Sequence, residues 1–308
     1  MLQILIRSLL LIELLFYVWF GGHLLDLGFN TGAIAASIVL IAVLWRISHA
    51  LTTYCVAMFL RWRDKRLLPF GNSLAAFASE LHARVISYNW SQAFPGLSLG
   101  PDPIGSGGGM PILLVHGFFS NRGMWLSFRN RLAAAKVGPV YTVTLEPLNG
   151  SIEAMMPTFE SRIDAIIRET GQQEIIVIAH SMGGLLARAY LAQVGATRIA
   201  KLITLGTPHH GSRIAALGVF ECAKQMRYRS PWIEMLEVME AANPPAIPAL
   251  SIYTLNDDLV YPPESSVLEW EGAENVPVSA VGHVALLYSE SIAKRVIAAI
   301  RKSGPPPE

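Results

Sequence analysis

Cysteine and charged residues are both scarce in this chain of 308 residues. The two cysteines, Cys55 and Cys222, are too few for a disulfide framework, and neither lies in a Cys-x-x-Cys motif or a Cys/His cluster that binds zinc. Charged residues make up 15% of the chain, and 24 basic against 23 acidic side chains leave a net charge of +1. We therefore expect no nucleic-acid partner, no metal and no cofactor.

Hydrophobic residues make up 52% of the chain, more than is usual for a soluble protein, and they gather near the N-terminus. Residues 27–45 contain no charged side chain over 19 positions, about the length that crosses the hydrocarbon core of a bilayer. Residues 2–20 are nearly as apolar, although a carboxylate such as Glu13 near a helix centre costs roughly 2.5–3.5 kcal/mol on insertion. We expect residues 1–47 to form a hairpin of two transmembrane helices, with its turn at residues 21–26.

A cleaved signal peptide is the alternative for residues 1–25. It is disfavoured because Arg7 is the only basic side chain before the apolar run and no small-residue cleavage site follows Phe20. The turn between the apolar segments carries no Lys or Arg, whereas a basic cluster follows the second segment: Arg46, Arg61, Arg63, Lys65 and Arg66. By the positive-inside rule, the remainder of the chain then faces the cytoplasm.

Residues 48–110 are interpreted as a connector. Apolar side chains recur at helical spacing over residues 47–62, so this part is either an interfacial helix or a continuation of the second apolar helix. Residues 94–111 are dense in glycine and proline, which is typical of a flexible linker. A phosphate-binding loop is not expected there, because no Gly-Lys-Ser/Thr or helix follows.

Short apolar runs alternate with amphipathic stretches over residues 111–304, which we interpret as one globular domain. The runs predict strands at residues 112–115, 140–145, 174–179, 200–205 and 249–255. The amphipathic stretches predict helices at residues 122–135, 158–169, 182–193 and 292–301. This alternation predicts an α/β fold with a mostly parallel sheet covered by helices on both faces, and places ligands at the carboxyl ends of the strands.

Ser181 is the candidate nucleophile. It lies in the sequence AHSMGG (residues 179–184), directly after a predicted strand and before a predicted helix. A serine exposed in such a tight turn needs very small neighbours two residues away on either side, and Ala179 and Gly183 meet that need. The alternative is an ordinary strand-to-helix turn in which the serine caps the helix.

A nucleophilic serine requires a histidine base and a carboxylate that orients it, and on this type of sheet they follow in the order serine, acid, histidine. His283 is the candidate base because it follows the last predicted strand and an acidic pair. That pair is Asp257 and Asp258. The spacing Asp-x-x-Val before a proline favours Asp257 as the acid, with Asp258 in reserve, and the other aspartate is expected to be a solvated loop charge.

Two backbone N–H groups are expected to bind the oxyanion. One is that of Met182, which follows the nucleophile, and the other is that of Phe118, in the loop after the first predicted strand. Gly117 permits close approach there. His116 is interpreted as a residue that stabilises the turn rather than as a second base.

Four segments together resemble the α/β-hydrolase lipases and esterases of bacteria: HGF (116–118), AHSMGG (179–184), GTPHHGS (206–212) and GHVALLY (282–288). The resemblance implies an α/β-hydrolase fold and ester hydrolysis through an acyl-enzyme. The small bacterial lipases are also similar around residues 251–260, which supports Asp257 as the acid. The paired cysteines and calcium-binding aspartates of larger lipases are not recognisable, so neither secretion nor metal dependence is carried over. GTPHHGS alone is equally compatible with a structural turn.

The expected function is that of a serine ester hydrolase of the lipase or carboxylesterase type, acting on lipid or other acyl esters. An acyltransferase with the same triad and a non-catalytic membrane-anchored scaffold are the alternatives. Apolar residues between 212 and 249 form either a lid over an acyl pocket or part of the core. The expected location is the bacterial inner membrane, with the catalytic domain on the cytoplasmic side.

Overall fold

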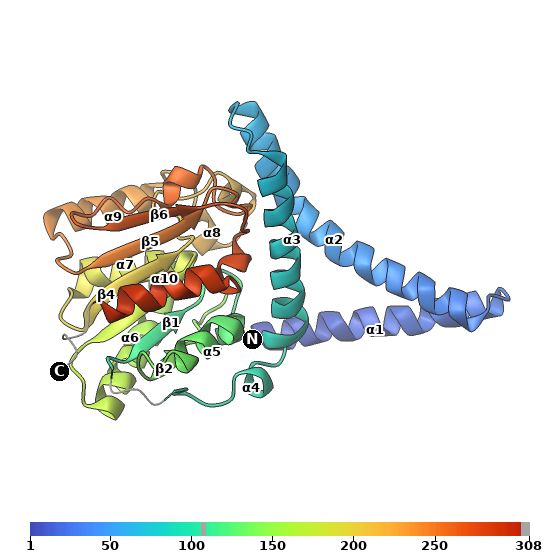
Figure 1. Ribbon diagram of the computed structural model, residues 1–308, viewed down its shortest axis with the longest axis horizontal. Coiled ribbons are helices and arrows are strands. Elements are labelled where there is room, and N and C mark those ends of the chain that lie inside the picture. Colours follow the sequence, from blue (N-terminus) through green and yellow to red (C-terminus); the bar gives the residue numbers. More distant parts are fainter. Residues whose placement is uncertain (106–108, 303–308) are drawn as a thin grey trace.

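A six-stranded parallel sheet forms the centre of the molecule in the computed structural model, which describes residues 1–105 and 109–302 (Figure 1). The strand order is β2-β1-β3-β4-β5-β6, and each neighbouring pair is parallel. The strands are β1 (Ile112–Val115), β2 (Val140–Thr142), β3 (Ile175–His180), β4 (Ile199–Leu205), β5 (Ala249–Thr254) and β6 (Glu274–Val278). The predicted mostly parallel sheet is confirmed.

Helices cover both faces of this sheet because the strand side chains alternate between two buried cores. Leu113 and Val177 belong to one core, whereas Leu114 and Ile178 belong to the other. The first core is completed by α6 (Ile152–Thr170), α7 (Met182–Val194) and α9 (Pro231–Ala242); the second is completed by α5 (Leu126–Ala134) and α10 (Glu290–Arg301). The remaining short helical segments are α4 (Pro95–Ser98), α8 (Glu221–Gln225), η1 (Ser87–Ser91), η2 (Arg122–Trp125), η3 (Ile214–Leu217), η4 (Pro263–Ser266) and η5 (Val284–Leu287).

Strand β6 and helix α3 (Phe70–Ile86) are not among the predicted elements. β6 is an edge strand whose side chains are only partly buried, and it contains Pro277, which an edge position tolerates. The buried face of α3 consists of small and polar residues: Ser73, Ala76, Glu80 and Ala83. Neither element therefore carries the apolar periodicity on which the predictions depended.

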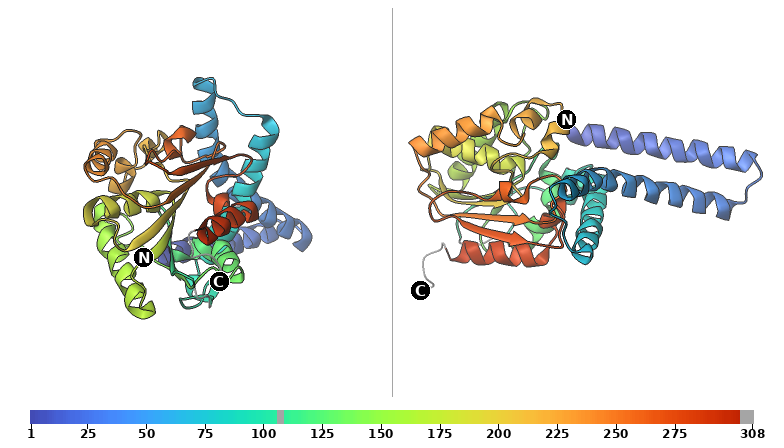
Figure 2. Two further views of the ribbon diagram at one scale, coloured as in Figure 1. Left: turned by 60° about the vertical axis from the view of Figure 1, so that its left-hand side comes forward. Right: turned by 90° about the horizontal axis from the view of Figure 1, so that it is seen from above.

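The two apolar N-terminal helices project from the globular part as a hairpin (Figures 1 and 2). They are α1 (Leu2–Asp26) and α2 (Thr31–Arg63). The predicted turn at residues 21–26 is wrong, because those residues are the last turns of α1 and the chain reverses at residues 27–30. A Cβ atom on Gly21 would lie 3.4 Å from the side chain of Ile38, an ordinary van der Waals distance, so this glycine lies inside α1 at its contact with α2. Residues 47–62 continue α2 without a break.

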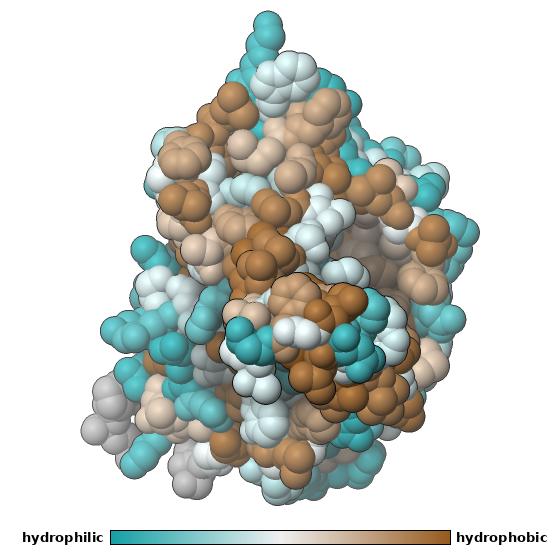
Figure 3. All heavy atoms as spheres, turned by 90° about the vertical axis from the view of Figure 1, so that its right-hand side faces the viewer, coloured by the Kyte–Doolittle hydropathy of each residue, from teal (hydrophilic) through white to brown (hydrophobic). Residues whose placement is uncertain are grey.

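Side chains of the hairpin are mostly exposed and apolar (Figure 3). Only 11% of the most apolar window of α1 and 6% of that of α2 is buried, so neither is the core helix of a soluble protein. Glu13, the unfavourable charge in α1, forms an ion pair with Arg46 of α2. Arg46 also donates to Asn89 Oδ1 at 2.8 Å. The carboxylate is thus neutralised within the protein, which reduces its insertion cost.

The glycine-rich segment before β1 is attached to the sheet domain through Asp102. Its buried carboxylate lies 3.1 Å from Arg122, 3.2 Å from Arg129 and 2.9 Å from Arg162, measured to a guanidinium nitrogen in each case. It also accepts the N–H of Thr142 in β2 at 2.7 Å. This part of the expected linker is therefore packed in place, while residues 106–108 lie outside the described residues.

Replacing Asp102 is expected to destabilise the protein strongly. Asp102→Ala leaves the buried Arg129 guanidinium without its carboxylate, and loss of one partner of a buried pair costs about 3–5 kcal/mol. The matched control is Asp164→Ala, which removes an ion pair with Arg198 whose side chains are 35% and 39% exposed and is expected to cost about 1 kcal/mol or less. Thermal unfolding of the full-length protein in detergent measures both. Equal shifts in Tm would contradict the structural role of Asp102.

Candidate active site

Ser181 occupies a strained backbone position at the carboxyl end of β3. Its φ and ψ angles are 54° and −127°, a region that residues other than glycine rarely adopt. Its N–H donates to the carbonyl oxygen of Leu205 at 2.9 Å, and α7 begins at the next residue. The turn holds the half-buried serine at the carboxyl ends of the parallel strands, where the loops after β1, β4 and β5 also lie. Such strain fits a nucleophile elbow better than an ordinary capping serine.

Three glycines leave the space that the serine and the histidine occupy. A Cβ atom on Gly117 would lie 2.8 Å from Ser181 Cβ, and one on Gly183 would lie 2.6 Å from the carbonyl oxygen of His116. Gly206 has φ +60°, and a Cβ there would lie 3.2 Å from the ring of His283. A side chain at Gly117 would displace Ser181, one at Gly206 would press on Leu286 and His283, and one at Gly183 would clash with the backbone of the loop after β1.

Asp257 and His283 are brought together although 26 positions separate them. His283 Nδ1 donates to Asp257 Oδ2 at 2.8 Å, and both side chains are almost fully buried. The other carboxylate oxygen, Oδ1, accepts the N–H groups of Leu259 at 2.8 Å and Val260 at 2.7 Å. The carboxylate is thus fixed in orientation and fixes the ring in turn.

Burial by itself lowers the pKa of His283, because it disfavours the charged imidazolium. The Asp257 carboxylate opposes this effect, both as a nearby negative charge and as a hydrogen-bond acceptor, and the negative charges of Glu80 and Asp258 act in the same direction. The pKa of His283 is therefore raised above its usual 6.5. The pair is suited to stabilise a proton on His283 during a reaction.

Asp258 is bound by the N-terminal helices rather than by His283. Its Oδ2 atom accepts hydrogen bonds from Thr53 of α2 and from Arg84 of α3, each at 2.6 Å. The two aspartates are both about 1% exposed, so the expectation that one is a solvated loop charge is wrong. The side chain of Asp258 instead joins the loop after β5 to the N-terminal helices.

Helix α3 also holds the segment that carries His283. Glu80 Oε2 accepts the N–H of Ala285 at 3.0 Å, and its Oε1 pairs with Arg84 at 2.8 Å. A Cβ atom on Gly282 would lie 2.5 Å from Glu80, so this glycine lets α3 approach the loop. Burial, followed by the nearby Asp258 charge, raises the pKa of Glu80 to about 7. Arg61 of α2 adds a hydrogen bond to the carbonyl of Asp257 at 2.8 Å.

Sequence reasoning missed these positioning residues, because all four belong to the expected connector: Thr53, Arg61, Glu80 and Arg84. It also assigned no role to His180, whose Nε2 donates to the carbonyl of His283 at 3.2 Å. Burial lowers the pKa of His180 well below its usual value, so this ring is neutral.

His116 acts in the turn, as its sequence position suggested. Its Nε2 accepts the N–H of Leu145 at 2.9 Å, and its Nδ1 donates to the carbonyl of Gly117 at 2.8 Å. Burial lowers the pKa of His116 to about 4.

His209, from the GTPHHGS segment, is buried, and its carbonyl oxygen accepts a hydrogen bond from Arg188 at 2.7 Å. That segment is a structural turn after β4.

The candidate oxyanion donors are available. Within residues 1–105 and 109–302, neither the Phe118 nor the Met182 N–H donates to another protein group. The Phe118 ring contacts those of Phe119 and Phe220, at centroid distances of 5.5 and 6.1 Å.

The region between residues 212 and 249, considered as a lid, is partly core: Leu236 is buried there, whereas Val238 of the same helix is 68% exposed. Among the described residues, no group of three or more His, Cys, Asp or Glu side chains has the arrangement of a metal site.

Comparison with known proteins agrees with this architecture. A family model described as the alpha/beta hydrolase fold matches residues 110–232. Among solved structures, lipase B of Aspergillus fumigatus superposes with a TM-score of 0.59 at 19% identity, covering 67% of this chain and 56% of that one. The mature form of Bacillus licheniformis lipase BlEst2 gives 0.55 at 15% identity, covering 65% and 95%. The fold is an α/β-hydrolase fold.

Sequence relatives of this α/β-hydrolase-fold chain include triacylglycerol lipases. The protein from Pseudarthrobacter phenanthrenivorans is 31% identical over 117 residues, which are 34% of this chain and 35% of the relative. The protein from Burkholderia plantarii is also 31% identical over 117 residues, covering 34% and 31%. The chain thus matches about a third of the length of these curated relatives, which are distant homologues of the lipase and esterase type.

Replacing Asp257 and Asp258 by asparagine, one at a time, tests which of the two carboxylates acts on His283. Asp257→Asn is expected to lower the pKa of His283, because the charge that opposes the effect of burial is lost. Asp258→Asn is expected to lower it less, since its carboxylate faces Arg84. NMR titration of ¹³C-labelled histidine in the full-length protein measures both shifts. If the pKa of His283 fell more in the Asp258→Asn variant than in the Asp257→Asn variant, Asp258 rather than Asp257 would be the carboxylate that acts on His283.

Proposed function

We propose that this protein is a membrane-attached serine ester hydrolase, of the lipase or carboxylesterase type, with Ser181, His283 and Asp257 as its triad. The observation that carries the proposal is the buried hydrogen bond of 2.8 Å between His283 and Asp257, at the same sheet edge as the strained Ser181. The lipase relatives support ester hydrolysis as the reaction class.

The proposed reaction has two steps. Ser181 Oγ attacks the ester carbonyl carbon while His283 Nε2 takes the hydroxyl proton, and His283 then protonates the departing alcohol. In the second step water attacks the acyl carbon while His283 Nε2 takes a proton from that water, and His283 then returns the proton to Ser181 Oγ as its bond to the acyl carbon breaks and the acid is released. The N–H groups of Phe118 and Met182 bind the oxyanion in both steps. Asp257 keeps Nδ1 protonated, so Nε2 is the basic nitrogen.

We further propose that residues 1–47 attach the hydrolase domain (residues 111–304) to a bilayer. The exposed apolar surface of α1 and α2 and the internal pairing of Glu13 with Arg46 support this placement. The basic residues after the hairpin favour a cytoplasmic catalytic domain at a bacterial inner membrane, by the positive-inside rule. An ester or lipid held in that bilayer is the proposed substrate.

Ser181→Ala is expected to lower kcat for p-nitrophenyl butyrate by about 10⁴-fold or more, because no other group can form the acyl-enzyme. The assay uses the full-length protein in detergent. A fluorophosphonate probe is expected to label Ser181 in the parent and not in the variant, as read by peptide mass spectrometry. The control is Ser127→Ala on α5, which is expected to retain full activity. Hydrolysis by Ser181→Ala at the parent rate would reject the nucleophile.

The pH dependence follows from the raised pKa of His283. A general base must be neutral in the free enzyme, so kcat/KM is expected to fall as the pH decreases through the pKa of His283. Because Asp257 raises that pKa, the midpoint of the acid limb is expected above pH 6.5. Initial rates from pH 5 to 9 measure it. A midpoint below 6.5 in the parent would contradict the electrostatic role of Asp257.

A further inference from the structure

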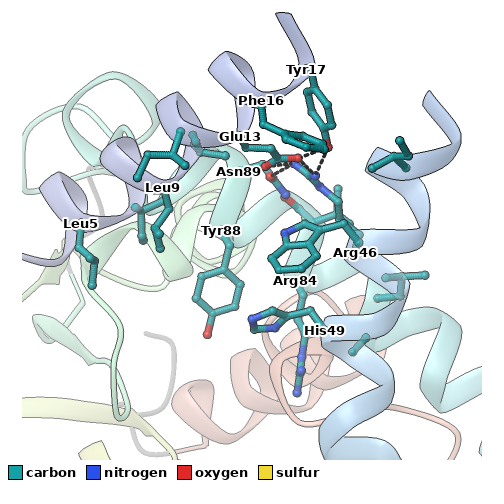
Figure 4. Close-up of a pocket in the computed structure, with 18 of the residues that line it drawn as sticks. Leu5, Leu9, Glu13, Phe16, Tyr17, Arg46, His49, Arg84, Tyr88 and Asn89 are labelled. Atoms are coloured by element: carbon teal, nitrogen blue, oxygen red, sulfur yellow. Dashed lines mark hydrogen bonds and ion pairs between the residues drawn. The ribbon is translucent and has the colours of Figure 1, made fainter. Parts of the chain in front are cut away.

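A large apolar cavity lies between α1, α2 and α3 (Figure 4). Its volume is about 720 Å³, which falls within the roughly 300–1,000 Å³ of pockets that hold small organic ligands. Figure 4 shows Leu5 and Leu9 of α1 on the side that faces His49 and Tyr88. Each of the three helices supplies apolar side chains to the wall, among them Leu5, Leu9, Ile41, Trp45, Leu81 and Val85.

The charged groups in the cavity wall are paired with one another. Glu13 is bound by Arg46, whose second partner is Asn89 (Figure 4). Arg84 is held by the carboxylates of Glu80 and Asp258. The wall therefore offers no unpaired guanidinium for a phosphate or carboxylate ligand. Its apolar surface and cancelled charges complement an uncharged hydrocarbon chain.

One end of the cavity adjoins the proposed active site. Phe119 lines it and is the neighbour of Phe118, the proposed oxyanion donor. Arg84 lines it too and binds Asp258, next to the proposed catalytic acid. The cavity wall thus includes one residue of the loop after β1 and one arginine that binds the loop after β5.

The other walls continue into the exposed apolar surface of the hairpin. Leu9, which lines the cavity, is 57% exposed, and the neighbouring turns of α1 expose Ile12 and Phe16, which also line it. Whatever apolar medium surrounds α1 and α2 therefore has direct access to the cavity. In a bilayer, that medium consists of lipid acyl chains.

We propose that this cavity binds the fatty acyl chain of a membrane lipid ester, which enters from the bilayer between α1 and α2 and presents its ester to Ser181 past Phe119. The inference rests on the proposed ester hydrolase activity and names its substrate class. In this arrangement the N-terminal helices form the acyl subsite as well as the anchor.

The test compares two leucines of α1 that are equally exposed but differently placed. Leu9 (57% exposed) lines the cavity, whereas Leu11 (55% exposed) does not. Leu9→Trp and Leu11→Trp are assayed as full-length proteins in detergent, with p-nitrophenyl palmitate and p-nitrophenyl butyrate. The parent is expected to have the higher kcat/KM for palmitate.

Leu9→Trp is expected to lower kcat/KM for palmitate by about fourfold per methylene group displaced from the cavity, hence tenfold or more for two or three. Its kcat/KM for butyrate is expected to equal that of the parent, and Leu11→Trp is expected to leave both values unchanged. Leu5→Trp provides a second variant, with Ile4→Trp as its control, because Leu5 lines the cavity and Ile4 does not.

Several results would overturn the proposal while leaving ester hydrolysis intact. They are a parent that prefers butyrate, equal palmitate activity in Leu9→Trp and Leu11→Trp, or loss of butyrate activity in both Leu9→Trp and Leu5→Trp. A change of oligomeric state in Leu9→Trp without a change in chain-length preference would assign the cavity to a protein helix instead. Hydrolysis of neither ester by the parent, or hydrolysis that survives Ser181→Ala, would reject the proposed function itself and this inference with it.

Discussion

The buried ion pair between Arg84 and Asp258 connects the two halves of this protein. Asp258 follows Asp257 directly, so the position of the Arg84 guanidinium determines where the loop after β5 presents its neighbouring carboxylate. Removing one partner would leave the other charge buried and unpaired, which costs several kcal/mol. The helices that precede the sheet domain are therefore part of the framework around the proposed triad, and not merely attached to it.

The same helix acts on the histidine loop. Glu80 binds the N–H of Ala285 and packs against Gly282, on either side of His283. The loops that follow the neighbouring strands β5 and β6 are thereby held against a single helix. Because Arg84 bridges Glu80 and Asp258, the acidic side chains can be buried close together despite their like charge. This arrangement links the proposed catalytic residues to the apolar N-terminal helices within one small chain.

Much of the fold was predictable because the parallel sheet is buried on both faces, and its strands therefore appear as continuous apolar runs. The elements that were not predicted are those whose positions do not require a run or stripe of apolar residues. Edge strand β6 is half-exposed, and α3 buries serine, alanine and glutamate. The turn of the hairpin was misplaced because Gly21 and Gly22 lie within α1, and a glycine pair in a single sequence does not distinguish a helix interior from a chain reversal.

The sequence by itself determined the position of Ser181, since a strand, a tight turn with small neighbours and a helix are all local requirements. It also reduced the number of candidates for the base and the acid, because the expected order serine, acid, histidine along the chain leaves few residues that could fill these roles. Only the tertiary structure decided that Asp257 faces His283 while Asp258 faces Arg84, and that α1, α2 and α3 enclose a cavity beside Phe119. The physical reason is distance along the chain: the contacts of Asp258 with Thr53 and Arg84 span 205 and 174 residues, and no local pattern encodes them.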